Sequence, residues 1–226
     1  MLAAMSDIAR NIEAIRQRMS AAAGRAGRDP ASVRLVGASK TVDPERIAQA
    51  LDAGLRDFGE NFIQEAEDRI ASLGSRADQA VWHFIGHLQT NKAGAAVNLF
   101  DILESVDSLR LAEHVSRRAS QPTRILLEVN VAQEASKFGF APAEVGAAIA
   151  RVQQLPNLEL GGLMTIAPAS PDPESVRPVF RELRELAHAH GLRELSMGMT
   201  DDFEVAIEEG ATMIRIGRAI FGERPQ

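Results

Sequence analysis

Short runs of hydrophobic residues alternate along the chain with longer segments in which hydrophobic residues recur every three or four positions. The short runs have the length and composition of buried strands, and they fall at residues 33–39, 56–60, 81–86, 100–105, 124–131, 158–166, 194–198 and 212–217. The longer segments have the period of amphipathic helices, and they fall at residues 43–53, 61–72, 107–119, 141–154, 174–190 and 201–209, with a shorter one at 91–98. Alternation of this kind is typical of βα units that build a parallel sheet.

About eight βα repeats follow one another, which is the number in a TIM barrel. The sequence therefore predicts an α/β fold, a single-domain (β/α)8 barrel over residues 33–222, with residues 1–226 forming one domain. An extra helix is expected within residues 1–30, where Ser6 is the predicted N-cap and the hydrophobic face consists of Ile8, Ile12, Ile15 and Met19. A doubly wound open sheet would give a similar pattern, but no G-x-G-x-x-G follows the first strand.

The composition narrows the class of protein. Hydrophobic residues make up 45% and charged residues 25% of the chain, as in globular proteins with a substantial core. The formal net charge of -6 argues against a general affinity for nucleic acid, which needs basic residues gathered on one face. We expect no membrane association and a cytoplasmic protein, because no hydrophobic run approaches the roughly 18 residues of a membrane span and no signal peptide is present. The absence of cysteine excludes disulfides and zinc–thiolate sites, and no metal site is expected.

The first predicted strand ends on a lysine, within RLVGASKTVDPERIAQALDAG (34–54). Asp43 and Pro44 have the pattern of an N-cap and a first helical residue, so Lys40 lies in a strand-to-helix turn, where TIM barrels place their functional residues. A surface lysine whose stem covers hydrophobic atoms is the simpler interpretation. The more informative hypothesis is an amine partly removed from water, which favours its neutral form and allows Schiff-base formation with an aldehyde.

The predicted seventh strand leads into a loop with the residue types that bind phosphate. TIM barrels often hold phosphate with the loops after strands 7 and 8, and the first of these contains SMGMT. Ser196 and Thr200 supply hydroxyls, and Gly198 lets the backbone approach an anion closely. For this loop alone, a glycine that only makes a tight turn is the better interpretation; phosphate binding is favoured only when this loop is taken together with the loop after the eighth predicted strand.

The predicted eighth strand continues the same pattern in RIGR (215–218). Gly217 and Arg218 begin a short final helix, whose first amides can bind an anion. Arg215 precedes them and can face the ring of a ligand, although a salt bridge to Glu60 or Glu128 is an equal alternative. A phosphate site that faces a lysine suits either a sugar phosphate in an aldolase-type reaction or pyridoxal 5′-phosphate (PLP), a phosphorylated aldehyde that proteins hold on lysine.

Several longer segments carry a resemblance to a known family. They are SKT (39–41), GENFIQEA (59–66), WHFIGHLQTNK (82–92), SVDSLRLA (105–112), ASKFGF (135–140), GLMTIAP (162–168) and LSMGMTDDFEVAIEEGATMIRIGRAIFG (195–222). Together they resemble the pyridoxal phosphate homeostasis protein family, from Val33 to Gly222, and the Trp82 and final segments are the most specific. That family is similar to the N-terminal barrel of alanine racemases, among the fold-type III PLP proteins.

The resemblance implies a role for several of the candidate residues. It implies that Lys40 forms the Schiff base, that Arg215 faces the pyridine nitrogen, and that Asn61 of the GEN motif lies close to the cofactor. The implied phosphate positions are Ser196, Gly217 and Arg218.

Arg218 departs from the family pattern, since this position commonly holds threonine or serine. If the family uses the backbone amide here, the change is harmless, and this is the interpretation that we favour. If the family uses the hydroxyl, the phosphate contact of this chain is remodelled.

The same resemblance implies a carrier rather than an enzyme. Racemisation needs a second base, which alanine racemases supply as a tyrosine from a C-terminal domain, and this sequence contains no tyrosine. His83 or His87 could substitute, but a structural role is the better prediction for both. The resemblance therefore implies a non-catalytic protein that binds PLP on a lysine and takes part in vitamin B6 homeostasis and amino-acid balance, with PLP-dependent apo-enzymes as recipients.

Three alternatives remain open from the sequence. A PLP-dependent amino-acid racemase is the first, a Schiff-base enzyme acting on a sugar phosphate is the second, and a barrel that has lost its ligand is the third. Lys137 could accept PLP in transit, although a solvated loop lysine is the better interpretation. We expect a monomer.

Overall fold

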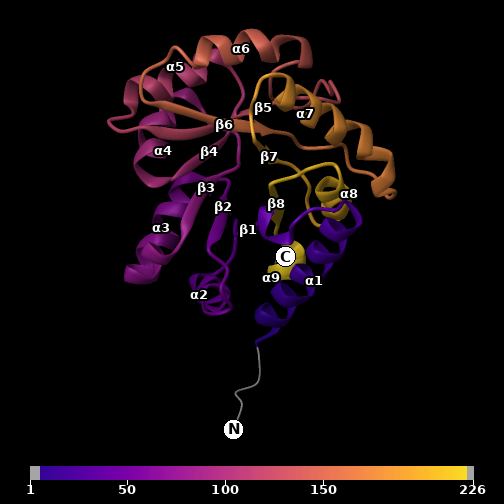
Figure 1. The fold of residues 1–226 in the computed structure, drawn as a ribbon. Coiled ribbons are helices and arrows are strands. Elements are labelled where there is room, and N and C mark those ends of the chain that lie inside the picture. The colour runs from indigo at the N-terminus through magenta and orange to yellow at the C-terminus, as the bar shows by residue number, and fades with distance from the viewer. Residues whose placement is uncertain (1–5, 223–226) are drawn as a thin grey trace.

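Eight parallel strands close into a barrel in chain order in the computed structural model, which describes residues 6–222 (Figure 1). The strands are β1 (Arg34–Ala38), β2 (Asp57–Glu60), β3 (Val81–Phe84), β4 (Ile102–Val106), β5 (Thr123–Glu128), β6 (Leu158–Met164), β7 (Glu194–Ser196) and β8 (Met213–Ile216). The predicted (β/α)8 barrel is therefore confirmed. The two ends of the predicted domain, 1–5 and 223–226, lie outside the described residues.

Helices follow the strands and surround the barrel. They are α1 (Asp7–Arg25), α2 (Pro44–Asp52), α3 (Ile63–Leu73), α4 (Ala93–Leu99), α5 (Leu109–Arg118), α6 (Val145–Val152), α7 (Arg177–Ala189), α8 (Phe203–Glu208) and α9 (Arg218–Phe221). Short 3-10 turns join several of these elements: η1 (Pro30–Ser32), η2 (Gly74–Gln79), η3 (Thr90–Lys92), η4 (Pro142–Glu144) and η5 (Pro173–Val176). The predicted N-caps Ser6 and Asp43 are confirmed, and Pro44 is the first residue of α2.

The order of the strands brings the two ends of the chain together. β1 pairs with β2 on one side and with β8 on the other, with Gly37 opposite Ile216. Because parallel strands end at the same edge of a barrel, the loops after β1, β2, β7 and β8 meet at one rim. Inside the barrel, a small hydrophobic cluster is formed by Val36, Leu126, Met164 and Met213.

The N-terminal helix takes the place of an outer helix. The helix after β8, α9, has only 4 residues, too few to cover the strands beside it. α1 packs against α8, α9 and α2 and so fills this position (Figure 1). Its predicted hydrophobic face is buried, and the Asn11 side-chain amide donates a hydrogen bond to the Ile220 carbonyl at 2.9 Å.

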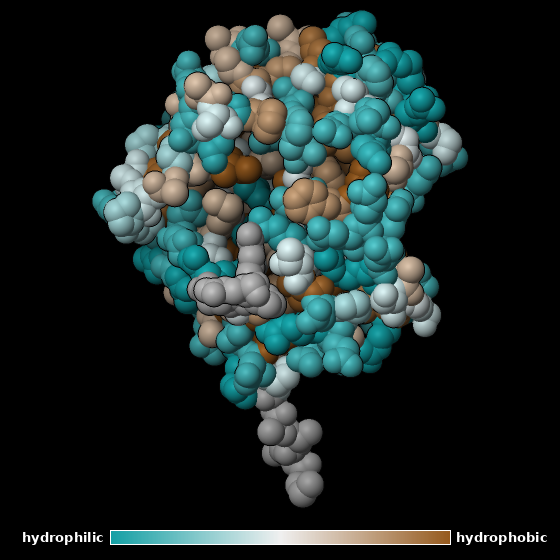
Figure 2. All heavy atoms as spheres, turned by 180° about the vertical axis from the view of Figure 1, so that it is seen from behind, coloured by the Kyte–Doolittle hydropathy of each residue, from teal (hydrophilic) through white to brown (hydrophobic). Residues whose placement is uncertain are grey.

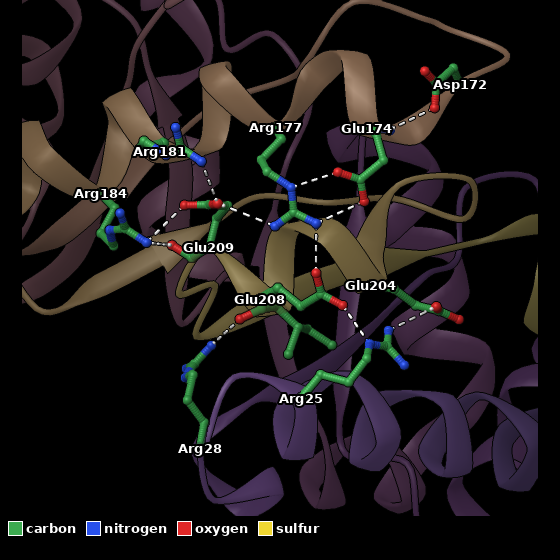
Figure 3. Close-up of polar contacts among 11 residues, drawn as sticks. Arg25, Arg28, Asp172, Glu174, Arg177, Arg181, Arg184, Glu204, Glu208 and Glu209 are labelled. Atoms are coloured by element: carbon green, nitrogen blue, oxygen red, sulfur yellow. Dashed lines mark hydrogen bonds and ion pairs between the residues drawn. The ribbon is translucent and has the colours of Figure 1, made fainter.

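Arginines and glutamates join α1, α7 and α8 at the outer surface (Figure 3). Arg177 donates to Glu208 at 2.6 Å and to Glu209 at 3.2 Å, while Arg25 of α1 donates to Glu208 at 2.6 Å. Further donors to Glu209 are Arg181 and Arg184. Burial raises the pKa of the Glu209 carboxyl, but the hydrogen bonds from α7 outweigh burial and hold that pKa below its ordinary value.

The rest of the surface is mainly hydrophilic. Figure 2 shows polar side chains over most of one face, with hydrophobic atoms visible chiefly in recesses between them. Among residues 6–222, no helix is long and apolar enough to cross a membrane.

Removal of Arg177 should weaken the attachment of α7 to α8. We expect Arg177→Met to lower the free energy of unfolding by about 1–3 kcal/mol, because two partly buried carboxylates lose a charged donor. The glutamate pKa values are lowered in the folded state, so this contribution is present above their ordinary value of 4.5 and is lost as the pH falls through the folded-state values. Urea denaturation at neutral and successively lower pH measures both effects.

The exposed ion pair of Arg76 with Asp52 provides the control. Arg76→Met should change the free energy of unfolding by less than about 0.5–1 kcal/mol. If the loss of unfolding free energy in Arg177→Met does not diminish at low pH, it does not arise from the ion pairs of Arg177 with Glu208 and Glu209.

Candidate functional site

Lys40 lies at the rim of the barrel, in the turn between β1 and α2, and is half-buried. The turn is closed by a hydrogen bond from the Val42 amide to the Ser39 carbonyl at 3.0 Å. Thr41 adopts φ 62°, in the left-handed region that a β-branched residue rarely occupies. The predicted position of Lys40, in a strand-to-helix turn, is therefore confirmed.

The loop after β7 contains Gly198 and Thr200 and begins earlier than predicted, because β7 ends at Ser196. Gly198 has φ 93°, and a Cβ built on it would lie 2.6 Å from the Ala206 Cβ. The position therefore accepts only glycine. The loop is fixed by the Asp202 carboxylate, which accepts a hydrogen bond from the Met199 amide at 2.6 Å.

The loop after β8 lies against the end of β1. A Cβ on Gly217 would lie 3.2 Å from the Ala38 carbonyl oxygen, so the backbone here passes close to the turn that carries Lys40. Gly217 is the N-cap of α9, as predicted. The first amides of a helix have no acceptor within the helix.

The side chain of Arg218 joins the two predicted phosphate loops. Its guanidinium donates to the Asp201 carboxylate at 2.8 and 2.9 Å, and both side chains are exposed. Arg218 belongs to the loop after β8 and Asp201 to the loop after β7, so the ion pair connects these loops across the rim.

Arg215 is buried inside the barrel and held by two acceptors. Its guanidinium donates to the Ser196 hydroxyl at 2.6 Å and to the Thr165 carbonyl at 2.9 Å. The Ser196 hydroxyl in turn donates to the Glu104 carboxylate. Since the one hydroxyl hydrogen of Ser196 is used in this way, its side chain is directed at the barrel network rather than at the loop.

The network continues to a buried histidine. His83 is fully buried, with Nδ1 2.6 Å from Glu104 and Nε2 3.1 Å from Asp57. Burial alone would lower the pKa of His83, but the hydrogen bonds to the two carboxylates raise it to about 9. The imidazole is therefore protonated at neutral pH, and the structural role predicted for His83 is confirmed.

Together these groups form a charge-balanced array across the barrel. The array consists of Asp57, His83, Glu104, Ser196 and Arg215, on β2, β3, β4, β7 and β8. Two carboxylates face two cations, which offsets much of the cost of burying each charge. The alternative partner Glu60 binds Arg69 instead, at 2.6 Å.

Asn61 follows β2 and carries an unsatisfied polar atom. Its Oδ1 is buried and has no hydrogen-bond partner within residues 6–222. The loop leaves no freedom at this point, because a Cβ on Gly86 would lie 2.4 Å from the Asn61 carbonyl oxygen. Buried polar atoms nearly always have a partner in native proteins, so this oxygen indicates a place for a ligand or water.

Glu128 and an aromatic pair complete the rim. Burial raises the pKa of Glu128 to about 7, with a further increase from Asp107 that Arg215 opposes. His87 lies 3.0 Å from Asp107 and stacks on Phe138 with ring centroids 3.7 Å apart.

Exposed loops make up the rest of the rim. Phe138 is 54% exposed and its neighbour Lys137 is exposed, as predicted for a solvated loop lysine. Within residues 6–222, no group of three or more acidic or histidine side chains is arranged to hold a metal ion.

Sequence reasoning missed Glu104 and the pairing of His83 with it. Both are polar residues inside short hydrophobic runs, FDILES and VWHFIG. Since alternate strand positions share a face, their inward direction could have been inferred from the strand register. Their pairing with each other and with Ser196 depends on barrel closure, and no local pattern encodes it.

Comparisons with known proteins identify the family. Residues 5–225 match the model of the alanine racemase N-terminal domain. The pyridoxal phosphate homeostasis protein of Pseudomonas aeruginosa is 46% identical, with 97% of each chain covered. The protein of that name from Escherichia coli (strain K12) is 43% identical, with 97% of this chain and 98% of the relative covered.

Solved structures agree with these relatives. PipY of Synechococcus elongatus PCC7942 with PLP bound is 35% identical, with a TM-score of 0.83, and covers 96% of this chain and 100% of its own. Alanine racemase from Corynebacterium glutamicum shares the fold at 17% identity, with a TM-score of 0.69, and this chain covers 61% of it. The predicted resemblance is confirmed: the chain belongs to the alanine racemase N-terminal domain family and, within it, to the pyridoxal phosphate homeostasis proteins.

Proposed function

We propose that this chain binds PLP, holds it as a Schiff base on Lys40, and serves PLP homeostasis without catalysing a reaction of its own. The observation on which the proposal rests is the half-buried Lys40 at a rim that it shares with the loops after β7 and β8, which contain Gly198 and Gly217. The names of the relatives and the PLP bound to PipY support the choice of ligand.

The residues at the rim fit this group. The Asn61 Oδ1 needs a hydrogen-bond donor. The backbone leaves no space for a side chain at Gly198 and little at Gly217. In this proposal Gly198, Thr200, Gly217 and the backbone of Arg218 hold the phosphate. The Arg218 side chain stays with Asp201, which agrees with the interpretation that the backbone amide is used at this position.

Arg215 is placed to hold the ring of the ligand. A guanidinium has five N–H donors and is always protonated, and the hydrogen bonds to Ser196 and Thr165 leave several of them for a ligand. Because Arg215 cannot give up its proton, a ring nitrogen beside it would stay unprotonated. Ser196 then acts on the cofactor through Arg215.

Bound PLP supplies an aldehyde that condenses reversibly with an amine, with loss of one water molecule. Lys40 provides that amine, whose neutral form attacks the carbonyl. A reversible covalent bond at an accessible rim suits storage and transfer. PLP-dependent apo-enzymes are the proposed recipients, and a monomer is the proposed state.

In this proposal neither His83 nor a tyrosine serves as the second base that racemisation needs. His83 has a pKa raised to about 9 and is held between two carboxylates, so at neutral pH it has no free site to accept a proton. The sequence contains no tyrosine. Both facts argue against racemisation, which needs proton acceptors on opposite faces of the substrate.

Borohydride reduction with PLP should label Lys40. The chain contains three lysines, Lys40, Lys92 and Lys137, so peptide mass spectrometry can assign the label completely among them. We expect Lys40→Ala to lose both the label and the visible absorption band of bound PLP. Lys92→Ala and Lys137→Ala are the matched controls and should keep both, and a label that persists in Lys40→Ala would contradict the proposal.

The phosphate should dominate affinity. We expect pyridoxal, which lacks the phosphate, to bind on the order of 100-fold more weakly than PLP, because charge-assisted hydrogen bonds to the loop amides are lost. Gly198→Ala should reduce this ratio, since its Cβ would collide with Ala206 and displace the loop. Gly24→Ala, with nothing within 4 Å of the added Cβ, should leave the ratio unchanged. Titration of the three proteins with each of the two ligands, followed by absorbance, measures the affinities.

Purified protein loaded with PLP should not racemise alanine or serine faster than an equal concentration of free PLP. The physical reason is that His83 is already protonated at neutral pH and that the sequence contains no tyrosine to act as the second base. Polarimetry or chiral chromatography measures the rate, and turnover well above the free-PLP rate would overturn the non-catalytic part of the proposal.

A further inference from the structure

The turn that carries Lys40 has an unfavourable backbone conformation. Thr41, the residue after the lysine, has φ 62°, which a β-branched side chain adopts only when its surroundings enforce it. Its hydroxyl donates to the Lys40 carbonyl at 2.6 Å, which is a contact within the turn. Contacts from outside the turn are therefore needed to hold Lys40 in this geometry.

A buried ion pair supplies these contacts. Glu60, at the end of β2, is fully buried, and Arg69 of α3 is 7% exposed. Arg69 donates from one nitrogen to Glu60 at 2.6 Å and from its Nε to the Val42 carbonyl at 2.9 Å. The other oxygen of Glu60 accepts from the Ser39 hydroxyl at 2.7 Å.

The ion pair thus reaches both ends of the turn. Ser39 comes immediately before Lys40, and Val42 closes the turn after it. Glu60 holds the first end and Arg69 holds the second, so a change in either partner is transmitted to the segment between them. This part of the structure is distinct from the array around Arg215: the side-chain hydrogen bonds of Glu60 and Arg69 go to Ser39, Val42, Glu65 and each other, and none of these residues belongs to the array.

We propose that Glu60 and Arg69 are positioning residues that fix the backbone of Lys40 for covalent capture of an aldehyde. The inference rests on the proposed function, in which Lys40 is the anchoring amine. The pair itself forms no bond with the ligand. Its effect is to hold one of three lysines in a fixed place at the rim, so that this lysine is captured in preference to the others.

An ordinary stabilising pair would have a different effect. Arg124 and Glu194 form such a pair near the starts of β5 and β7, at the opposite end of the barrel, with a hydrogen bond of 2.9 Å from Nε. Loss of that pair should affect stability alone. Loss of the Glu60–Arg69 pair should in addition change which lysine reacts and how fast.

The experiment compares Arg69→Met and Ser39→Ala with the wild-type protein. Each is mixed with PLP at a temperature where circular dichroism shows it folded, reduced with borohydride at timed intervals, and analysed for label at Lys40, Lys92 and Lys137. We expect Arg69→Met to slow labelling of Lys40 at least 10-fold and to raise the share found at the other two lysines. Ser39→Ala removes a single hydrogen bond and should show the same change to a smaller extent, which keeps the test informative if Arg69→Met fails to fold.

Arg124→Met is the matched control and should retain the wild-type rate and distribution of label, whatever its melting temperature. If Arg69→Met and Ser39→Ala are folded and show the wild-type labelling rate and distribution of label, the inference is overturned. If the wild-type protein itself leaves Lys40 unlabelled, the proposed function fails. The positioning role is then tested by acetylation of the lysines with acetic anhydride. If the acetylation of Lys40 relative to Lys92 is the same in Arg69→Met and Ser39→Ala as in the wild-type protein, the positioning role is overturned as well.

Discussion

The site depends on a set of charges buried inside the barrel. Glu104 lies at the centre, between the His83 imidazolium and the Ser196 hydroxyl, and Ser196 in turn receives the Arg215 guanidinium. Removing one partner of such a buried pair costs about 3–5 kcal/mol, because the other charge is left uncompensated. Arg215 is therefore held in place before any ligand arrives, as its proposed role beside the ring of PLP requires.

The closure of the barrel supplies the second requirement. β8 pairs with β1, so the loop containing Gly217, near the end of the sequence, meets the turn containing Lys40, near its beginning. The close approach of Gly217 to the Ala38 carbonyl shows how little space separates them. The Lys40 amine and the backbone proposed to bind phosphate thus share one rim, and α1 packs on α8, α9 and α2 outside the β8–β1 pairing.

Much of this arrangement could be predicted from local patterns. The barrel could be predicted because short hydrophobic runs alternate with segments of helical period. The position of Lys40 could be predicted from Asp43 and Pro44 at the start of the next helix. Arg69 could not be recognised as a buried residue. It follows Glu65 by four positions, which is the spacing of a surface ion pair on an amphipathic helix, whereas in the structure it is buried against Glu60. The partner of Arg218 was equally hidden, since the contact with Asp201 joins two separate loops. Contacts of this kind depend on chain closure, and local sequence carries no record of them.

A crystal structure of the protein grown with PLP would show directly whether Lys40 holds the ligand covalently at the rim. We expect continuous electron density from the Lys40 Nζ to the ligand. The phosphate should lie between the loops after β7 and β8, and the Arg215 guanidinium should lie at the ring nitrogen. Density that places PLP elsewhere, with the Lys40 side chain directed away from the barrel, would contradict this expectation.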